Sequence, residues 1–180
     1  MISAAKLGDV DAFGLLFERN KDAVYSFVAR SVGRREDAED IVQDVFLRAW
    51  RSIERFRGDS ALTTWLCSIA ANRCRDYYRS AQRRVTPETD LRFGTTDIES
   101  VEELAGDVES TSVTKETVSD ALGKLNISQR MLVVLCDVQG FTYKEAAEIV
   151  GCSQVSVKVM LHRARKKLRT LLAGVLDQVD

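Results

Sequence analysis

The sequence predicts an all-α protein with two small helical domains joined by an acidic, flexible linker. Apolar residues recur at helical spacing on both sides of the middle of the chain, and no alternating pattern suggests a strand. The middle lacks this periodicity and contains the single proline, Pro87. We therefore expect a first domain at residues 1–85, a linker at 86–115 and a second domain at 116–180.

Apolar spacing in the first block predicts three helical regions. Residues 13–28 suggest one long helix or two short ones, and Gly33 ends this section. The next helix has a continuous apolar stripe over 38–53, and its first turns are acidic, which suits the helix dipole. A loop is expected at 55–60, and a third helix from about 62 to 83.

The third helix also has a polar side. Asn72, Asp76, Arg79 and Arg83 lie at i, i+4, i+7 and i+11, so they share one face. Basic residues interleaved with aromatic ones are what single-stranded DNA needs, because charge binds the backbone and rings stack on bases. Trp65 by itself is more typical of a core residue.

The second block predicts two short helices followed by a helix-turn-helix. Apolar stripes cover 118–125 and 131–135, and Ser128 is a candidate cap for the second stripe. Asn126 follows Leu125 and can also cap a helix.

Residues 142–169, TYKEAAEIVGCSQVSVKVMLHRARKKLR, are the most informative stretch. Thr142 and Glu145 suit a capping box, Gly151 a turn with positive φ, and Ser153 an N-cap. The second helix of this motif then presents a strongly basic face. Such a helix suits the major groove of DNA, where phosphates give affinity and base edges give specificity.

Charge is segregated along the 180 residues, although the net charge is only −1. Residues 1–85 carry 15 basic and 12 acidic side chains, and residues 122–180 carry 9 and 5. Residues 86–121 carry 2 basic and 10 acidic side chains and are therefore net −8. Two mildly basic blocks around an acidic connector indicate a polyanion as the partner of the blocks.

Composition excludes several classes of protein. With 45% apolar and 29% charged residues the chain is globular, and no apolar run approaches the roughly 18 residues of a membrane span. We see no secretory signal, so we expect a cytoplasmic protein without membrane insertion. The four cysteines form no C-x-x-C pair and suggest buried thiols, and no P-loop or nucleophile elbow is present. We therefore expect no enzyme activity, catalytic residue, metal or cofactor.

Together these motifs resemble the bacterial RNA polymerase sigma factors of the extracytoplasmic-function (ECF) type, group 4 of the sigma-70 family. EDAEDIVQDVFLRAW, FRGDS and TWLCSIAANRCRDYYRS resemble sigma region 2. LGKLNISQRMLVVL, the helix-turn-helix and LHRARKKLR resemble region 4. The resemblance implies a factor that binds core RNA polymerase, reads a −35 duplex and captures a melted −10 element. It also implies partners: the β′ and β subunits of the polymerase, promoter DNA and an anti-sigma factor, with a monomeric free chain.

The resemblance assigns candidate residues to three surfaces. Those for core polymerase match or adjoin the D-x-x-Q-[DE] signature of region 2: Asp37, Asp40, Gln43, Asp44 and Arg48. Those for the −10 element are Phe56, Arg57, Gly58, Asp59, Ser60, Asn72, Arg73, Asp76, Arg79 and Arg83. Those for the −35 element are Ser153, Gln154, Ser156, Lys158, His162, Arg163 and Arg165.

Three positions depart from the family pattern. Asn126 stands where the family usually has Pro, Met160 where it usually has Arg, and Val159 where it often has Ser or Thr. The last two changes remove polar DNA contacts. Two other readings stay open: a conventional duplex-DNA regulator, and a polymerase-binding adaptor or inactive sigma paralogue, which the changes at Met160 and Val159 favour slightly. The acidic helix of the first block and the basic helix of the second also permit a closed free form.

Overall fold

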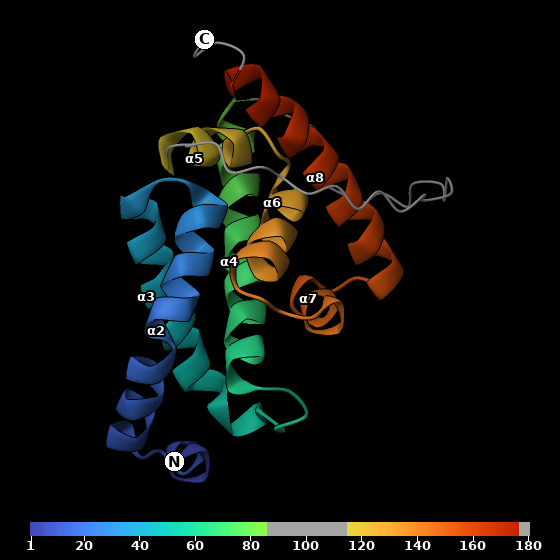
Figure 1. Ribbon diagram of the computed structural model, residues 1–180. Coiled ribbons are helices and arrows are strands. Elements are labelled where there is room, and N and C mark those ends of the chain that lie inside the picture. Colours follow the sequence, from blue (N-terminus) through green and yellow to red (C-terminus); the bar gives the residue numbers. More distant parts are fainter. Residues whose placement is uncertain (86–114, 177–180) are drawn as a thin grey trace.

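The protein folds as two groups of helices that pack side by side (Figure 1). The computed structural model describes residues 1–85 and 115–176, and the predicted all-α class is confirmed there. The predicted acidic linker lies outside the described residues. None of the helices in the described parts of the chain is both long and apolar enough to cross a membrane.

The first group is a bundle of three long helices with two short elements at one end. The long helices are α2 (Val10–Val32), α3 (Arg35–Ser52) and α4 (Leu62–Val85), and the short ones are α1 (Ile2–Lys6) and the 3-10 turn η1 (Ile53–Arg55). One long helix, α2, is thus confirmed, and it ends at Gly33 with a φ of +82°. The short helix α1 was not predicted, because five residues are too few to show a helical period.

The second group contains the helix-turn-helix. Its elements are α5 (Lys115–Gly123), α6 (Ile127–Val133), the π-helical turn η2 (Val134–Val138), α7 (Tyr143–Val150) and α8 (Gln154–Leu176). Asn126 caps α6, because its Oδ1 accepts a hydrogen bond from the backbone N–H of Gln129 at 2.8 Å. The prediction of Ser128 as the cap was therefore wrong, since Ser128 lies inside the first turn of α6.

The local devices predicted for the helix-turn-helix are confirmed. The Thr142 hydroxyl accepts a hydrogen bond from the backbone N–H of Glu145, and the Glu145 carboxylate accepts one from the backbone N–H of Thr142 at 2.9 Å. Gly151 takes a φ of +75° and its N–H donates to Ala147 O at 2.8 Å. The Ser153 hydroxyl accepts from the N–H of Ser156 at 3.1 Å, which caps α8.

The two groups share one continuous apolar core. Contacts join α4 to α7, and they join α2 to α6 and η2. The sequence permitted a closure by charge, with acidic α3 against basic α8, but this interface is built differently. Apolar surfaces of α2 and α4 meet apolar surfaces of α6 and α7 instead, so burial of apolar area holds the two groups together.

Two polar side chains of the second group cross this interface. Arg130 of α6 is buried, and one of its Nη atoms donates to Ser31 O at 2.8 Å and to the hydroxyl of Tyr78. Its other Nη donates to Gly123 O at 2.7 Å within its own group. Gln139 Nε2 donates to Ala23 O at 2.7 Å. A buried cation is costly unless hydrogen bonds satisfy it, so this arginine fixes the relative placement of the two groups.

Candidate protein and nucleic-acid interfaces

The polymerase-binding candidates lie on α3. Asp37, Asp40, Asp44 and Arg48 fall at i, i+3, i+7 and i+11, which places them along one side of the helix. Asp40, Gln43 and Arg48 are exposed, whereas Asp37 and Asp44 are half-buried. The carboxylates along this side can steer and orient a basic partner.

Leu47 belongs to the same surface and was missed by sequence reasoning. It lies one helical turn after Gln43 and Asp44, on the same side of α3, and its side chain is 50% exposed. An exposed leucine among charged side chains offers an apolar contact at the centre of a protein interface. The available signal was its position outside the buried stripe of α3.

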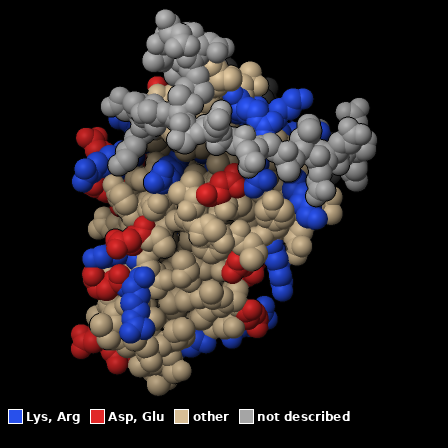
Figure 2. Space-filling model, viewed as in Figure 1, with Lys and Arg blue, Asp and Glu red and all other residues tan. Residues whose placement is uncertain are grey.

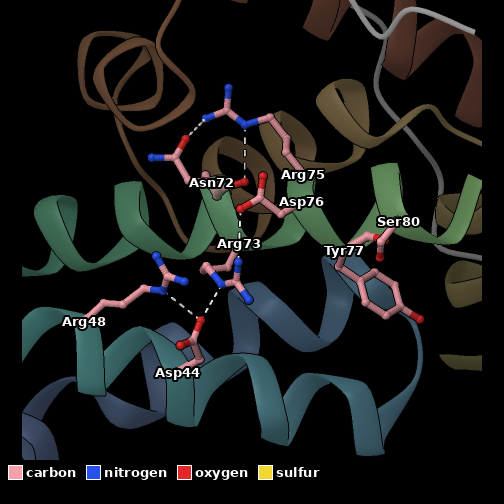
Figure 3. A network of polar contacts seen from close by, with 9 residues as sticks. Asp44, Arg48, Asn72, Arg73, Arg75, Asp76, Tyr77 and Ser80 are labelled. Atoms are coloured by element: carbon pink, nitrogen blue, oxygen red, sulfur yellow. Dashed lines mark hydrogen bonds and ion pairs between the residues drawn. The ribbon is translucent and has the colours of Figure 1, made fainter. Parts of the chain in front are cut away.

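Asp44 connects this surface to α4 (Figure 3). Its Oδ2 accepts a hydrogen bond from Arg48 Nε at 2.9 Å and forms an ion pair with Arg73 of α4. Arg73 in turn binds the carboxylate of Asp76 at 3.0 Å. Two residues expected at the −10 element are therefore linked by charge to a residue expected at the polymerase.

An open pocket of about 500 Å³ lies between α3 and α4. Its lining includes residues of both predicted surfaces, Asp44, Arg48, Asn72, Arg73 and Asp76, together with Arg51, Ser52 and Ile69, which were not predicted. Three guanidinium groups with an amide and two carboxylates can bind a phosphate or the polar edge of a base. The structure thus brings together residues that lie 28 positions apart in the sequence, Asp44 and Asn72.

Asn72 is exposed and oriented by a neighbour. Its Oδ1 accepts a hydrogen bond from Arg75 Nη2 at 2.6 Å, and Arg75 Nε donates to Ala71 O at 3.3 Å. Burial lowers the pKa of Arg75, which nevertheless stays a cation at neutral pH. Arg75 was not among the predicted site residues, yet it determines how the Asn72 amide is presented.

Asp37 is held between the same two helices. The Tyr77 hydroxyl donates to Asp37 Oδ2 at 2.7 Å, and Arg34 Nε lies 3.3 Å from the same carboxylate. Burial, together with the hydrogen bond to Asp37, raises the pKa of Tyr77. Asp37 therefore contributes to the packing of α3 on α4 as well as to the acidic surface.

In the loop between η1 and α4, one prediction needs correction. Phe56 was expected to contact DNA, but its side chain is only 5% exposed and packs against Trp65 with ring centroids 5.3 Å apart. The Phe56 ring instead attaches the loop to the apolar side chains beneath it, away from solvent. Arg57 and Asp59 are exposed and form an ion pair at 3.2 Å across Gly58, whose φ is +81°.

The remaining −10 candidates follow the loop and α4. Ser60 is half-buried at the end of the loop, and Arg79 is exposed on α4. Arg83 belongs to α4, but its side chain lies outside the described residues.

The −35 candidates lie along α8 or, for Ser153, at its N-terminal cap, and Lys and Arg side chains are visible on that side of the molecule (Figure 2). Ser156 is half-buried. The other candidates are exposed, namely Ser153, Gln154, Lys158, His162, Arg163 and Arg165. Arg165 binds Asp137 of η2 through two hydrogen bonds of 3.1 and 2.6 Å, and this raises the pKa of Arg165. The pair fixes the direction of that guanidinium.

The two departures from the family pattern on α8 have a structural counterpart. Val159 and Met160 are half-buried, and Met160 packs against the main core. Met160 therefore contributes to the packing of α8 on that core. No group of three or more His, Cys, Asp or Glu side chains within the described ranges is arranged to hold a metal ion.

Comparison with known proteins matches both groups of helices to named regions. The family model for Sigma-70 region 2 matches residues 16–84, and that for Sigma-70, region 4 matches residues 115–168. The ECF RNA polymerase sigma-E factor of Haemophilus influenzae is 32% identical over 98% of this chain and 95% of its own.

Two solved structures with the same fold are complexes with another protein. The sigma factor RpoE in complex with the anti-sigma factor NepR, from Bartonella quintana, is 29% identical, with a TM-score of 0.71 over 91% of this chain and 98% of that one. CnrH in complex with the cytosolic domain of CnrY is 29% identical, with a TM-score of 0.68 over 96% of this chain and 95% of that one.

Proposed function

Because this chain belongs to the ECF sigma factors of the sigma-70 family, we propose that it reads a −35 duplex with α8 and captures a melted −10 strand with α4 and the loop before it. The family acts in promoter-specific initiation with core RNA polymerase. The finer division of labour is our proposal, and so is the domain division at residues 1–85, 86–115 and 116–180.

The pocket between α3 and α4 is the observation that carries the proposal. Asp44, matched to the polymerase-binding signature, and Asn72, matched to base capture, line the same cavity. A strand bound there would lie directly beside the polymerase surface. Arg48, Arg51 and Arg73 supply positive charge for the DNA backbone, and Asn72 can pair with a base edge.

Base capture explains how such a factor opens DNA without chemistry of its own. A duplex opens transiently, and a protein that binds the extruded base preferentially shifts that equilibrium. Unstacking costs a few kcal/mol, which hydrogen bonds and stacking with the extruded base offset. We therefore propose that the factor is not an enzyme.

The two groups of helices must move apart if both promoter elements are to be bound at once. A compact chain of this length has a radius of gyration of about 16 Å, so its diameter is about 40 Å. Elements centred near −35 and −10 are about 25 base pairs apart, or roughly 85 Å of duplex at 3.4 Å per pair. The 29 residues between α4 and α5 can span about 100 Å when extended. We propose that the interface holding Arg130 opens on the promoter.

An anti-sigma factor is the regulator we propose for this chain. RpoE and CnrH, which share the fold, are each bound by another protein in their solved structures. A partner that contacts both groups of helices in the closed arrangement would stabilise it by its differential affinity, and would thereby hold the protein inactive in the cytoplasm.

In vitro transcription tests the function. Core RNA polymerase is incubated with and without the protein on fragments of the genome that encodes it, and transcript 5′ ends are mapped. We expect discrete start sites that require the protein and share two sequence elements upstream. Native gels with core polymerase and with duplex DNA accompany the assay.

The alternatives give different results in the same experiment. An adaptor or inactive paralogue would bind core polymerase and produce no new start sites. A conventional regulator would bind a duplex operator tightly and would not bind core polymerase. Either outcome would overturn the proposed function.

A further inference from the structure

A second, smaller apolar core lies at the end of the first group, beneath the loop before α4. Its buried members come from α1, α2, η1 and the loop: Ala5, Ala12, Leu16, Ile53 and Phe56. Leu62 and Trp65 of α4 pack against it from the other side of the loop. In Figure 1, α1 lies beside the turn that leads from α3 into this loop, and contacts between α1 and η1 agree.

Phe56 is the point where the loop is attached to this core. Its ring is 5% exposed, lies 5.3 Å from the Trp65 ring and has Lys6 Nζ at 5.8 Å from its centroid. Its N–H donates to Ile53 O at 3.0 Å. Beyond it come Gly58, with a positive φ, and the highly exposed Arg57–Asp59 pair. Exposed ion pairs contribute little, so the buried ring is the main fixed point at the start of the loop.

The helix α1 covers Phe56 and lies outside the matched family region. The match to Sigma-70 region 2 begins at residue 16, whereas α1 ends at Lys6. Ala5 is 1% exposed in the small core, and Gly8 and the capping residue Asp9 turn the chain sharply into α2. The side chain of Asp9 accepts a hydrogen bond from Ala12 N at 2.9 Å, so the turn is well defined.

We propose that α1 is a brace for the base-capturing loop: it positions the loop through Phe56 and thereby sets affinity and base selectivity at the −10 element. The inference rests on the proposed function of that loop. A loop that is already ordered loses less conformational entropy when the strand binds. Phe56 and α1 are positioning residues and do not touch the DNA themselves.

Two substitutions in α1 separate this role from charge and from folding. Ala5→Glu places an unpaired carboxylate in the small core and should displace α1, because burying such a charge is costly. Ser3→Glu adds the same charge at an exposed position of the same helix and serves as the control. Phe56→Ala and the milder Phe56→Leu remove the contact from the loop side.

Hydrogen exchange gives a readout that needs no DNA. We expect the amides of residues 57–61 to exchange at least about tenfold faster in Ala5→Glu and Phe56→Ala than in the parent, and unchanged in Ser3→Glu. The double variant Ala5→Glu/Phe56→Ala should be no worse than either single variant, because both act through one contact.

The functional readout uses a single-stranded oligonucleotide that carries the −10 segment of a promoter mapped as above. Ala5→Glu should bind it roughly tenfold more weakly and should discriminate less against an oligonucleotide with the captured base replaced. Affinities for core polymerase and for −35 duplex should stay within about twofold of the parent. Phe56→Leu should lose less than Phe56→Ala.

If Ala5→Glu and Ser3→Glu had equal amide exchange rates in the loop and equal oligonucleotide affinities, the proposal that α1 positions the loop would be refuted. If Ala5→Glu also lost helical content, the two Phe56 variants would decide, and parent-like exchange of the loop in Phe56→Ala would overturn it. If the parent protein initiates transcription but the α1 and Phe56 substitutions lack the expected effects, only the role of α1 is refuted and the proposed function stands. A parent that does not initiate refutes the function itself.

Discussion

Asn72 depends on one neighbouring residue for its orientation. Its amide oxygen is held by Arg75 at 2.6 Å, at the edge of a pocket that Asp44 and Arg73 also line. An amide held this way presents a fixed pattern of donors and acceptors to a base. The surroundings of Asn72, more than its residue type, are what make it suitable for base recognition.

We predict that Asn72→Ala reduces promoter opening at least about fivefold, since a good base contact is worth about 1–3 kcal/mol. Binding to core polymerase should stay unchanged. Permanganate footprinting of the melted region measures opening. Ser80→Ala is the control, because its hydroxyl is bonded only locally, to Tyr77 O at 2.8 Å on the same helix. Normal opening with Asn72→Ala would refute the base-capture assignment.

The cysteines differ in reactivity according to burial. Burial raises the pKa of both Cys67 and Cys74 to about 12. A thiol with that pKa is about one part in ten thousand thiolate at pH 8, and the thiolate is the reactive form. We predict that iodoacetamide at pH 8 leaves Cys67 and Cys74 unmodified in the native protein, while the half-buried Cys152 reacts first. Peptide mass spectrometry, with unfolded protein as the control, checks this; early alkylation of Cys67 would contradict it.

At the scale of elements, the helix-turn-helix depends on the cap of its first helix. Hydrogen bonds from the side chain and backbone of Thr142 lower the pKa of Glu145. A carboxylate whose pKa is lower in the folded state adds stability above its unfolded pKa, and this stability is lost as pH falls through the folded value.

We predict that Glu145→Ala lowers the free energy of unfolding by about 1 kcal/mol at pH 7. The difference from the parent protein should shrink as the pH falls below about 4. Glu148→Ala, at an exposed position of the same helix, is the matched control and should have little effect. Denaturant titrations at several pH values measure both, and equal losses for the two variants would contradict the capping role.

Charged residues of α3 that are expected to face a partner also bind residues of α4. Asp44 joins Arg48 on its own helix to Arg73 on the neighbouring one, and Tyr77 reaches across to Asp37. Acidic residues expected to face a partner therefore also hold the two helices in register. Substituting Asp44 should affect both surfaces, whereas Asp40, which is exposed, should affect the polymerase surface alone.

At the scale of the whole molecule, polar contacts and a shared core hold a closed arrangement. The hydroxyl of Tyr78 and the amide of Gln139 each complete a hydrogen bond between the two groups. Each such bond contributes about 0.5–1.5 kcal/mol. Losing both should therefore shift the equilibrium between closed and open forms by about fivefold or more.

We predict a radius of gyration close to 16 Å for the free protein in solution, and a larger value for Tyr78→Phe combined with Gln139→Ala. Small-angle X-ray scattering measures both. Gln129→Ala, on the same helix as Arg130, is the control. Open variants should also associate with core polymerase faster than the parent. Identical scattering curves for the double variant and the control would show that these two hydrogen bonds do not hold the closed arrangement.

The sequence by itself determined most of the helices, the caps of the helix-turn-helix and the two regions. These features depend on residues within about four positions of one another, such as Thr142 with Glu145 or Ala147 with Gly151. Helical spacing also showed which side of α3 is apolar. The candidate residues on α3, α4 and α8 fall on the elements expected for them, and most are exposed there.

Only the tertiary structure decided what covers each side chain. Phe56 has the sequence context of a loop residue, but α1 and Trp65 bury it. Arg130 has the context of a surface residue, but it bonds to Ser31, 99 positions away. A periodic pattern shows which face of a helix avoids water, whereas the partner of that face depends on the packing of distant segments. That packing also made Asp44 part of two surfaces and placed the two regions in a closed arrangement.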